Sequence, residues 1–163
     1  MQRAGIMRRF ASLTYESLLL VALVFIASFL IAPLVSPASA LRDSLVVPST
    51  LGRAISFLAL FSLLASYFVF GTSLGRRTLP MKTWRLRLVT TSGETISRKT
   101  ALLRYLAAWI GPALAVAAFG LLKPIGLGAI AWPLVALNWL APLVDPDRQF
   151  LHDRIAGTRL VID

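Results

Sequence analysis

The chain has 163 residues, of which 57% are hydrophobic and only 15% are charged, and this composition is too apolar for a soluble domain. Because it has no cysteine and His152 is its only histidine, disulfides, thiolate chemistry and histidine-rich metal sites are excluded, and no cofactor is expected. The net charge of +10 comes from Lys and Arg residues at the ends of apolar runs, which favours a lipid bilayer and its anionic headgroups as partners rather than nucleic acid.

Four apolar runs approach the length of about 20 residues that a helix needs to cross a bilayer. They cover about residues 12–34, 54–74, 101–122 and 124–143, and Lys123-Pro124 divides the last two. We therefore expect an all-α membrane protein, a bundle of four transmembrane helices forming one domain over residues 1–163.

The basic residues predict the orientation of these spans. The loop between the second and third runs is rich in Lys and Arg, whereas the turn between the third and fourth holds Lys123 alone. By the positive-inside rule, this pattern predicts cytoplasmic N- and C-termini and a location in a bacterial cytoplasmic (inner) membrane. Three spans, with the basic tail outside, fit the bias less well.

A secretory signal is the alternative interpretation of the first run. Arg8-Arg9, an apolar core and Ala38-Ser39-Ala40 match the general pattern of such a signal and its cleavage site. The run is long for a signal core and contains Glu16 near its start, so we favour a membrane anchor.

The loop after the second run predicts a short cytoplasmic β-hairpin. Apolar and basic residues alternate over 84–88, turn residues occupy 91–94, and 95–97 would form the returning strand, with Ser97 as the N-cap of the next helix. Its basic residues form a candidate surface for lipid or a partner protein: Arg85, Arg87, Arg98 and Lys99. A solvated loop that only sets topology is the alternative.

Four charged residues form the candidate functional cluster: Arg9, Glu16, Arg104 and Asp153. Glu16 lies within the first run, where an ionisable group costs on the order of 3 kcal/mol, and Arg9 and Glu16 share a helix face. Glu16 could carry a proton or cation, pair with Arg9, Arg104 or Arg154, or extend to the interface. Ion pairing is the favoured interpretation. We expect Asp153 to pair with Arg9 or Arg104, with ion gating by His152 and Asp153 as the alternative.

Helix packing is expected from Asn138 and from two stripes of small residues. The Asn138 amide is placed to hydrogen-bond across helices rather than to line a pathway. The stripes, which would let helices approach closely, are Ser62, Ser66, Val69 and Ser73 in the second run and Ala107, Gly111, Ala115 and Ala118 in the third.

The tail at residues 148–161, R-Q-F-L-H-D-R-I-A-G-T-R-L-V, resembles the RDD family of membrane proteins, named for one arginine and two aspartates. Residues 78–104 are similar to its middle section. The resemblance puts the family arginine on Arg9, or Arg8, and the tail aspartate on Asp153. Glu16 stands where the first aspartate is expected, and Met81 stands where a glycine is expected.

The resemblance implies transport of ions or small solutes, since sodium/proton exchange is proposed for some relatives. A four-helix monomer has little interior, so a carrier of this size is expected to form homo-oligomers. The alternative is an accessory or scaffold that binds lipid or a partner membrane protein without transporting anything. An enzyme is not expected, because the sequence shows no nucleophile–base pair and no metal-ligand set.

Overall fold

The computed structural model describes residues 4–35 and 48–163, so Ala38-Ser39-Ala40 of the secretory-signal alternative lies outside the described residues. The described elements, with η denoting a 3₁₀ helix, are α1 (Ile6–Val35), α2 (Thr50–Thr72), α3 (Leu79–Thr83), β1 (Leu86–Thr90), α4 (Arg98–Ala108), α5 (Ile110–Leu122), η2 (Lys123–Ile125), η3 (Gly128–Ala136), α6 (Leu137–Val144), α7 (Leu151–Ile155) and β2 (Thr158–Ile162).

Three helical segments are long and apolar enough to cross a membrane. They are α1 (Ile6–Val35), α2 (Thr50–Thr72) and the combined segment Arg98–Ile125, which consists of α4, α5 and η2. They overlap the first three predicted runs. The Ser97 hydroxyl accepts a hydrogen bond from the Thr100 N–H at 3.1 Å, which confirms the predicted N-cap of the third segment.

The fourth predicted run is not one regular α-helix. It consists of the 3₁₀ helix η3 followed by the short helix α6, and together they are shorter than the other three segments. Pro133 lies within η3 and Pro142 within α6. Pro133 lacks the N–H that an α-helix requires and lies in the segment that is 3₁₀ rather than α, whereas α6 accommodates Pro142 without a break. The predicted break is present, since η2 begins at Lys123 and Gly126 adopts a φ of +77°.

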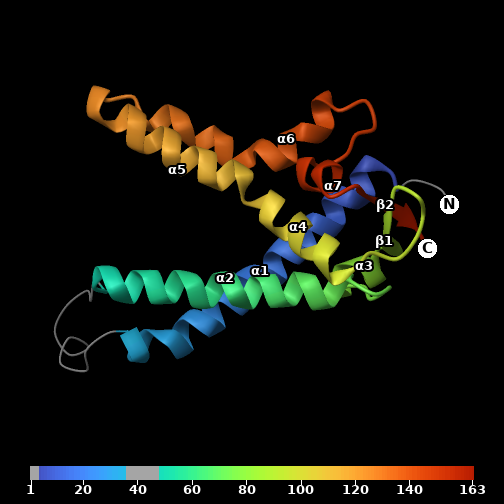
Figure 1. Cartoon of the computed structure of the whole chain (residues 1–163), viewed down its shortest axis with the longest axis horizontal. Helices are drawn as coiled ribbons and strands as arrows, with labels where there is room; N and C mark the ends of the chain where they lie inside the picture. Colours follow the sequence, from blue (N-terminus) through green and yellow to red (C-terminus); the bar gives the residue numbers. More distant parts are fainter. Residues whose placement is uncertain (1–3, 36–47) are drawn as a thin grey trace.

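Two antiparallel helix pairs diverge from the end of the molecule that holds the sheet (Figure 1). One pair is α1 with α2, and the other is α5 with η3 and α6. The return of η3 and α6 alongside α5 brings the chain back to the end where α1 begins, so the start of α1 and the last strand, β2, lie at the same end (Figure 1).

Close packing of α5 against η3 depends on small side chains. A Cβ added to Gly111 would lie 2.7 Å from the carbonyl oxygen of Leu134, and Ala115 is fully buried. This contact confirms the packing role predicted for the third-run stripe. The second-run stripe is packed only at its end: Ser73 is buried and Val69 packs against the hydrophobic core, whereas Ser62 and Ser66 are exposed.

The two strands, β1 and β2, pair antiparallel although they lie far apart in sequence. Leu86 is opposite Ile162 and Leu88 is opposite Leu160. These three leucines belong to a small hydrophobic core. The same core contains Met81 of α3, Ile96 just before α4, and Ala101 of α4. The sheet therefore connects the middle of the chain to its tail.

The predicted β-hairpin is wrong in its partner strand. Residues 95–97 supply only one isolated bridge, from Thr95 to Val89, before Ser97 caps α4. So short a segment leaves most of β1 without a partner, and β2 takes that place with five paired residues.

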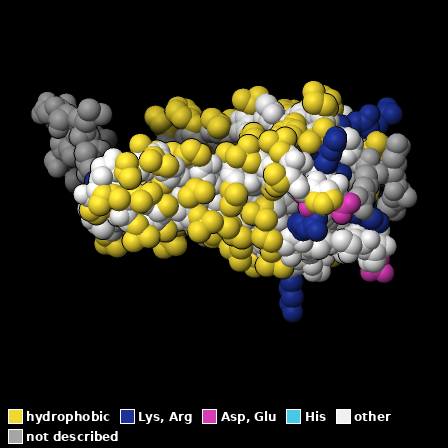
Figure 2. All heavy atoms as spheres, turned by 90° about the horizontal axis from the view of Figure 1, so that it is seen from above, with side chains coloured by type: hydrophobic (Ala, Val, Ile, Leu, Met, Phe, Trp, Pro, Cys, Tyr) yellow, Lys and Arg dark blue, Asp and Glu magenta, His cyan; other side chains and the backbone are white. Residues whose placement is uncertain are grey.

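The outer surface separates an apolar body from a charged end. Hydrophobic side chains cover most of the face in Figure 2, whereas the charged side chains gather toward the end that carries the sheet. Large apolar residues such as Phe25, Phe29 and Val116 are exposed along the helices. Such a surface is stable in contact with lipid chains and unfavourable in water.

Candidate functional site at the charged end

The buried face of α1 is its polar face. Arg9, Ser12 and Glu16 are the buried residues of this helix, at spacings of three and four that put them on one side. Apolar neighbours such as Leu18 and Phe25 are exposed. A helix in lipid turns its ionisable groups toward the protein interior, as here, so the stripe predicted from the sequence marks the inner face.

Glu16 contacts a tyrosine of the neighbouring helix. Glu16 is only 6% exposed. Tyr67 Oη of α2 donates a hydrogen bond to Glu16 Oε1 at 3.3 Å. Two arginines predicted as its partners form ion pairs elsewhere, Arg104 with Asp153 and Arg154 with Asp145. The ion pairs of these two arginines are therefore with other carboxylates, although the Arg104 charge also acts on Glu16.

Arg104 and Asp153 form a buried ion pair between α4 and α7. Arg104 Nε lies 2.5 Å from Asp153 Oδ1, and their side chains are 12% and 2% exposed. Thr158 Oγ1 donates to the same carboxylate oxygen at 3.3 Å, and Arg104 Nη2 lies 3.1 Å from His152 Nε2. The expectation that Asp153 fastens the tail to the helices through Arg104 is confirmed.

This surrounding keeps His152 neutral and Asp153 charged. Burial lowers the pKa of His152 from 6.5 to about 4, and the Arg104 charge adds to this effect while Asp153 opposes it. Burial alone would raise the pKa of Asp153, but the charge and hydrogen bond of Arg104, together with His152 and the Thr158 hydroxyl, outweigh it and hold that pKa below its usual value. Since Arg104 can only donate, its bond assigns the His152 proton to Nδ1.

The tail is also tied to α1, α4 and α6. Asn138 Nδ2 donates to the Ala108 carbonyl oxygen at 2.6 Å, and Asn138 Oδ1 accepts from the His152 N–H at 3.2 Å. The Phe150 ring stacks on His152 and meets Phe10 of α1 edge to face, at centroid distances of 5.6 and 5.5 Å. The cross-helix hydrogen bond predicted for Asn138 is confirmed.

A cavity of about 20 Å³ lies where these elements meet. Arg9, Ser12, Glu16 and Arg104 contribute to its wall, together with Leu13, Met81, Phe150 and Leu160. A single water needs roughly 10–15 Å³, so the cavity has room for one water or one small ion. Three of the four predicted cluster residues line it directly, and Asp153 joins them through Arg104.

Sequence reasoning missed two contributors to this site. Tyr67 supplies the hydroxyl that reaches Glu16, and the backbone carbonyl of Arg148 accepts a hydrogen bond from Arg9 Nη1 at 2.8 Å. A tyrosine inside a membrane helix usually finds a partner for its hydroxyl, and this signal was available for Tyr67. The carbonyl contact had no sequence signal.

The four basic residues predicted as a lipid or partner surface have different surroundings. Arg98 lies over the Phe70 ring at 5.3 Å, whereas Arg85 lines a pocket with Arg8. Arg87 is half-buried and Lys99 is exposed. They are therefore not four equivalent surface charges.

Within residues 4–35 and 48–163, no group of three or more His, Cys, Asp or Glu side chains is arranged to hold a metal ion. The chemistry that this site offers is that of a carboxylate and hydroxyls beside two guanidinium groups.

Comparison with known proteins identifies the family. No curated protein and no solved structure is significantly similar to the chain. The family model of the RDD family matches residues 3–157, nearly the whole chain, including the residues of the charged site. The chain therefore belongs to the RDD family, and its three long apolar helical segments make it an integral membrane protein.

Proposed function

We propose that this RDD-family protein moves a proton or a small cation across the membrane, with the Glu16 carboxylate as the group that binds it. One observation carries the proposal: Glu16 is buried beside a cavity of one-water size, while Arg104 is engaged by Asp153. A carboxylate is costly inside a membrane helix, and such groups commonly mark ion pathways or proton relays.

The chemistry of the cavity suits exchange. Glu16 and the Ser12 hydroxyl offer the oxygen ligands that hard cations prefer. A carboxylate that accepts a proton loses the charge that attracts a cation, so the two bind in competition.

The proposal includes four crossings of the membrane. At about 2.0 Å per residue in a 3₁₀ helix and about 1.5 Å in an α-helix, η3 and α6 together extend roughly 30 Å, the thickness of the hydrocarbon core. An even number of crossings agrees with the start of α1 and the last strand, β2, lying at one end (Figure 1). By the positive-inside rule, this basic end is cytoplasmic.

Cysteine labelling tests the topology directly, because the chain has no cysteine of its own. Ser92→Cys places a thiol in the turn at the charged end, and Leu127→Cys places one in the turn between α5 and η3. A membrane-impermeant maleimide is expected to label only Leu127→Cys in intact cells and both variants after lysis. Labelling of both, or of Ser92→Cys alone, in intact cells would overturn the orientation.

Ion flux in proteoliposomes tests the transport proposal. Wild type and Glu16→Gln are reconstituted under an imposed sodium or pH gradient, and flux is followed with an internal pH dye and with ²²Na. Glu94→Gln is the matched control, since it makes the same change at an exposed residue of the turn. Circular dichroism and size-exclusion chromatography check that each variant is folded.

We expect flux from wild type and Glu94→Gln, and only the leak of protein-free vesicles from a folded Glu16→Gln. Equal flux from folded Glu16→Gln and wild type would remove Glu16 from the mechanism. No wild-type flux with either ion would contradict the proposal of proton or sodium transport. Because the helix pairs diverge, the transporting unit is proposed to contain more than one copy.

A second candidate is an accessory that binds lipid or a partner membrane protein. The observation that favours it is the pair of diverging apolar arms, which leaves helix faces open to another membrane protein (Figure 1). Neutralising Arg85, Arg87, Arg98 and Lys99 together is then expected to weaken lipid or partner capture, while Glu16→Gln affects only stability. Unchanged capture would contradict this candidate.

A further inference from the structure

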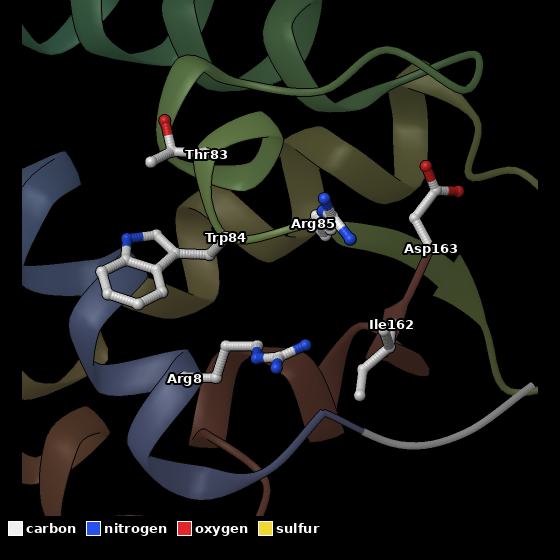
Figure 3. A pocket seen from close by; sticks show the side chains of 6 residues that line it. All are labelled: Arg8, Thr83, Trp84, Arg85, Ile162 and Asp163. Atoms are coloured by element: carbon white, nitrogen blue, oxygen red, sulfur yellow. The ribbon is translucent and has the colours of Figure 1, made fainter.

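A second pocket, of about 360 Å³, lies at the charged end and is separate from the Glu16 cavity. Its wall combines the first turns of α1, the segment between α3 and β1, and the end of β2. The lining residues are Arg8, Thr83, Trp84, Arg85, Ile162 and Asp163 (Figure 3). Pockets that bind small molecules usually measure roughly 300–1,000 Å³, so this one has the size of a ligand site.

Two arginines from distant parts of the chain face this space. Figure 3 shows the Arg8 guanidinium extending below Arg85, between Trp84 and Ile162. The Asp163 carboxylate points away from Arg8 and pairs with Arg77, outside the pocket. The acid in the wall is thus neutralised by another arginine, and the pocket keeps the positive charge of Arg8 and Arg85.

The segment that carries Arg85 is held in a fixed and uncommon conformation. Arg85 has a φ of +51°, which few residues other than glycine adopt. Its carbonyl oxygen accepts the Asp163 N–H at 3.0 Å, and its own N–H donates to Lys82 at 3.2 Å. Unfavourable backbone conformations maintained in this way are found preferentially at ligand-binding sites.

The pocket lies beside the lipid-facing surface. Met7, which precedes Arg8 on α1, is 80% exposed, and Leu79 of α3 is also exposed. Trp84 is partly exposed at the pocket wall, and tryptophan is enriched at the level of lipid headgroups. A ligand here can place an anionic group on the arginines and apolar chains against the helices.

We propose that this pocket binds the phosphate of an anionic glycerophospholipid. Guanidinium groups bind phosphate oxygens through paired, charge-assisted hydrogen bonds, and the Thr83 hydroxyl adds a further polar group. The inference is independent of ion transport, since none of its residues lines the Glu16 cavity.

Lipid retention by the purified full chain tests the proposal. The protein is titrated with phosphatidylglycerol or phosphatidylcholine in detergent, and bound lipid is counted by native mass spectrometry. The double variant Arg8→Gln/Arg85→Gln is compared with Arg76→Gln/Lys82→Gln, which removes the same charge from exposed residues that do not line the pocket. Thermal unfolding verifies that all proteins are folded.

Wild type and the control variant are expected to retain phosphatidylglycerol in preference to phosphatidylcholine. The pocket variant is expected to bind phosphatidylglycerol on the order of tenfold more weakly than the control. Equal loss in both double variants would show only general surface attraction and overturn the proposal, as would wild-type retention in the pocket variant. Displacement by millimolar inorganic phosphate, but not by equal ionic strength of chloride, would assign the pocket to free phosphate instead of lipid.

Discussion

Asp153→Asn isolates the contribution of the buried ion pair, because asparagine has almost the same shape but no charge. In the variant, Arg104 would keep its guanidinium in a side chain that is 12% exposed, facing a neutral amide and the neutral His152. The Thr158 hydroxyl would still have an oxygen acceptor at the same position. The change therefore tests charge and leaves packing nearly unaltered.

The expected loss of unfolding free energy is large. Removing one partner of a buried pair costs about 3–5 kcal/mol, because the other charge is left uncompensated. Asp145→Asn is the matched control: the Asp145 side chain is 10% exposed, but its partner Arg154 is 56% exposed, so the arginine left without a carboxylate can be hydrated. Exposed pairs contribute about 0–1 kcal/mol, so the two variants should differ by roughly 2 kcal/mol or more.

Reversible unfolding by SDS in mixed micelles, followed by circular dichroism, measures this difference. A third variant, Arg104→Met with Asp153→Leu, removes both charges and is expected to recover a large part of the loss. The reasoning would be refuted if Asp153→Asn were as stable as Asp145→Asn. It would also be refuted if the double variant were less stable than Asp153→Asn.

Three further predictions use the same assay. Unfolded His152 takes up a proton near pH 6.5 but the folded chain only near pH 4, so wild type should lose roughly 3 kcal/mol as the pH falls through this window. His152→Gln should remove that loss. Gly111→Ala should cost about 1–3 kcal/mol, because its Cβ would lie 2.7 Å from a carbonyl oxygen of η3. Gly120→Ala, whose Cβ would meet nothing within 4 Å, should instead stabilise helix α5 by about 0.5–1 kcal/mol. Tyr105→Phe should cost about 1 kcal/mol through loss of its 2.8 Å hydrogen bond to the Phe61 carbonyl oxygen.

Each of these predictions has an outcome that contradicts it. Equal pH dependence in wild type and His152→Gln would show that this imidazole takes up its proton at the same pH in both states. A Gly111→Ala variant as stable as Gly120→Ala would contradict the close approach of α5 and η3. If Tyr105→Phe were as stable as wild type, the hydrogen bond between the Tyr105 hydroxyl of α4 and the Phe61 carbonyl of α2 would contribute nothing to the free energy of unfolding.

The inner face of α1 could be predicted from the sequence because lipid reverses the usual pattern. In a membrane helix the apolar residues face outward, so the few polar ones identify the interior. Arg9, Ser12 and Glu16 carry this signal at helical spacing, and Asn138 carries it in the last apolar run. Local residue type was sufficient for these positions.

The partner of β1 could not be predicted in the same way. The turn residues at 91–94 favour a local hairpin, and nothing nearby indicates that the strand pairs with Thr158–Ile162 instead. The sequence likewise could not show whether Arg104 forms its ion pair with Glu16 or with Asp153, since both carboxylates were candidate partners. The position of α7 decides it, and that position depends on contacts between residues distant in sequence.

The placement of α7 and β2 after all the long helices has a consequence for biosynthesis. Arg104 is made 49 residues before its partner Asp153, which at about 5–20 residues per second is an interval of roughly 2–10 s. During that time the guanidinium has no buried carboxylate of the tail to meet, and it must stay hydrated or among lipid headgroups. The charged end can therefore close only after the tail residues have been made, when all the apolar segments have already been synthesised.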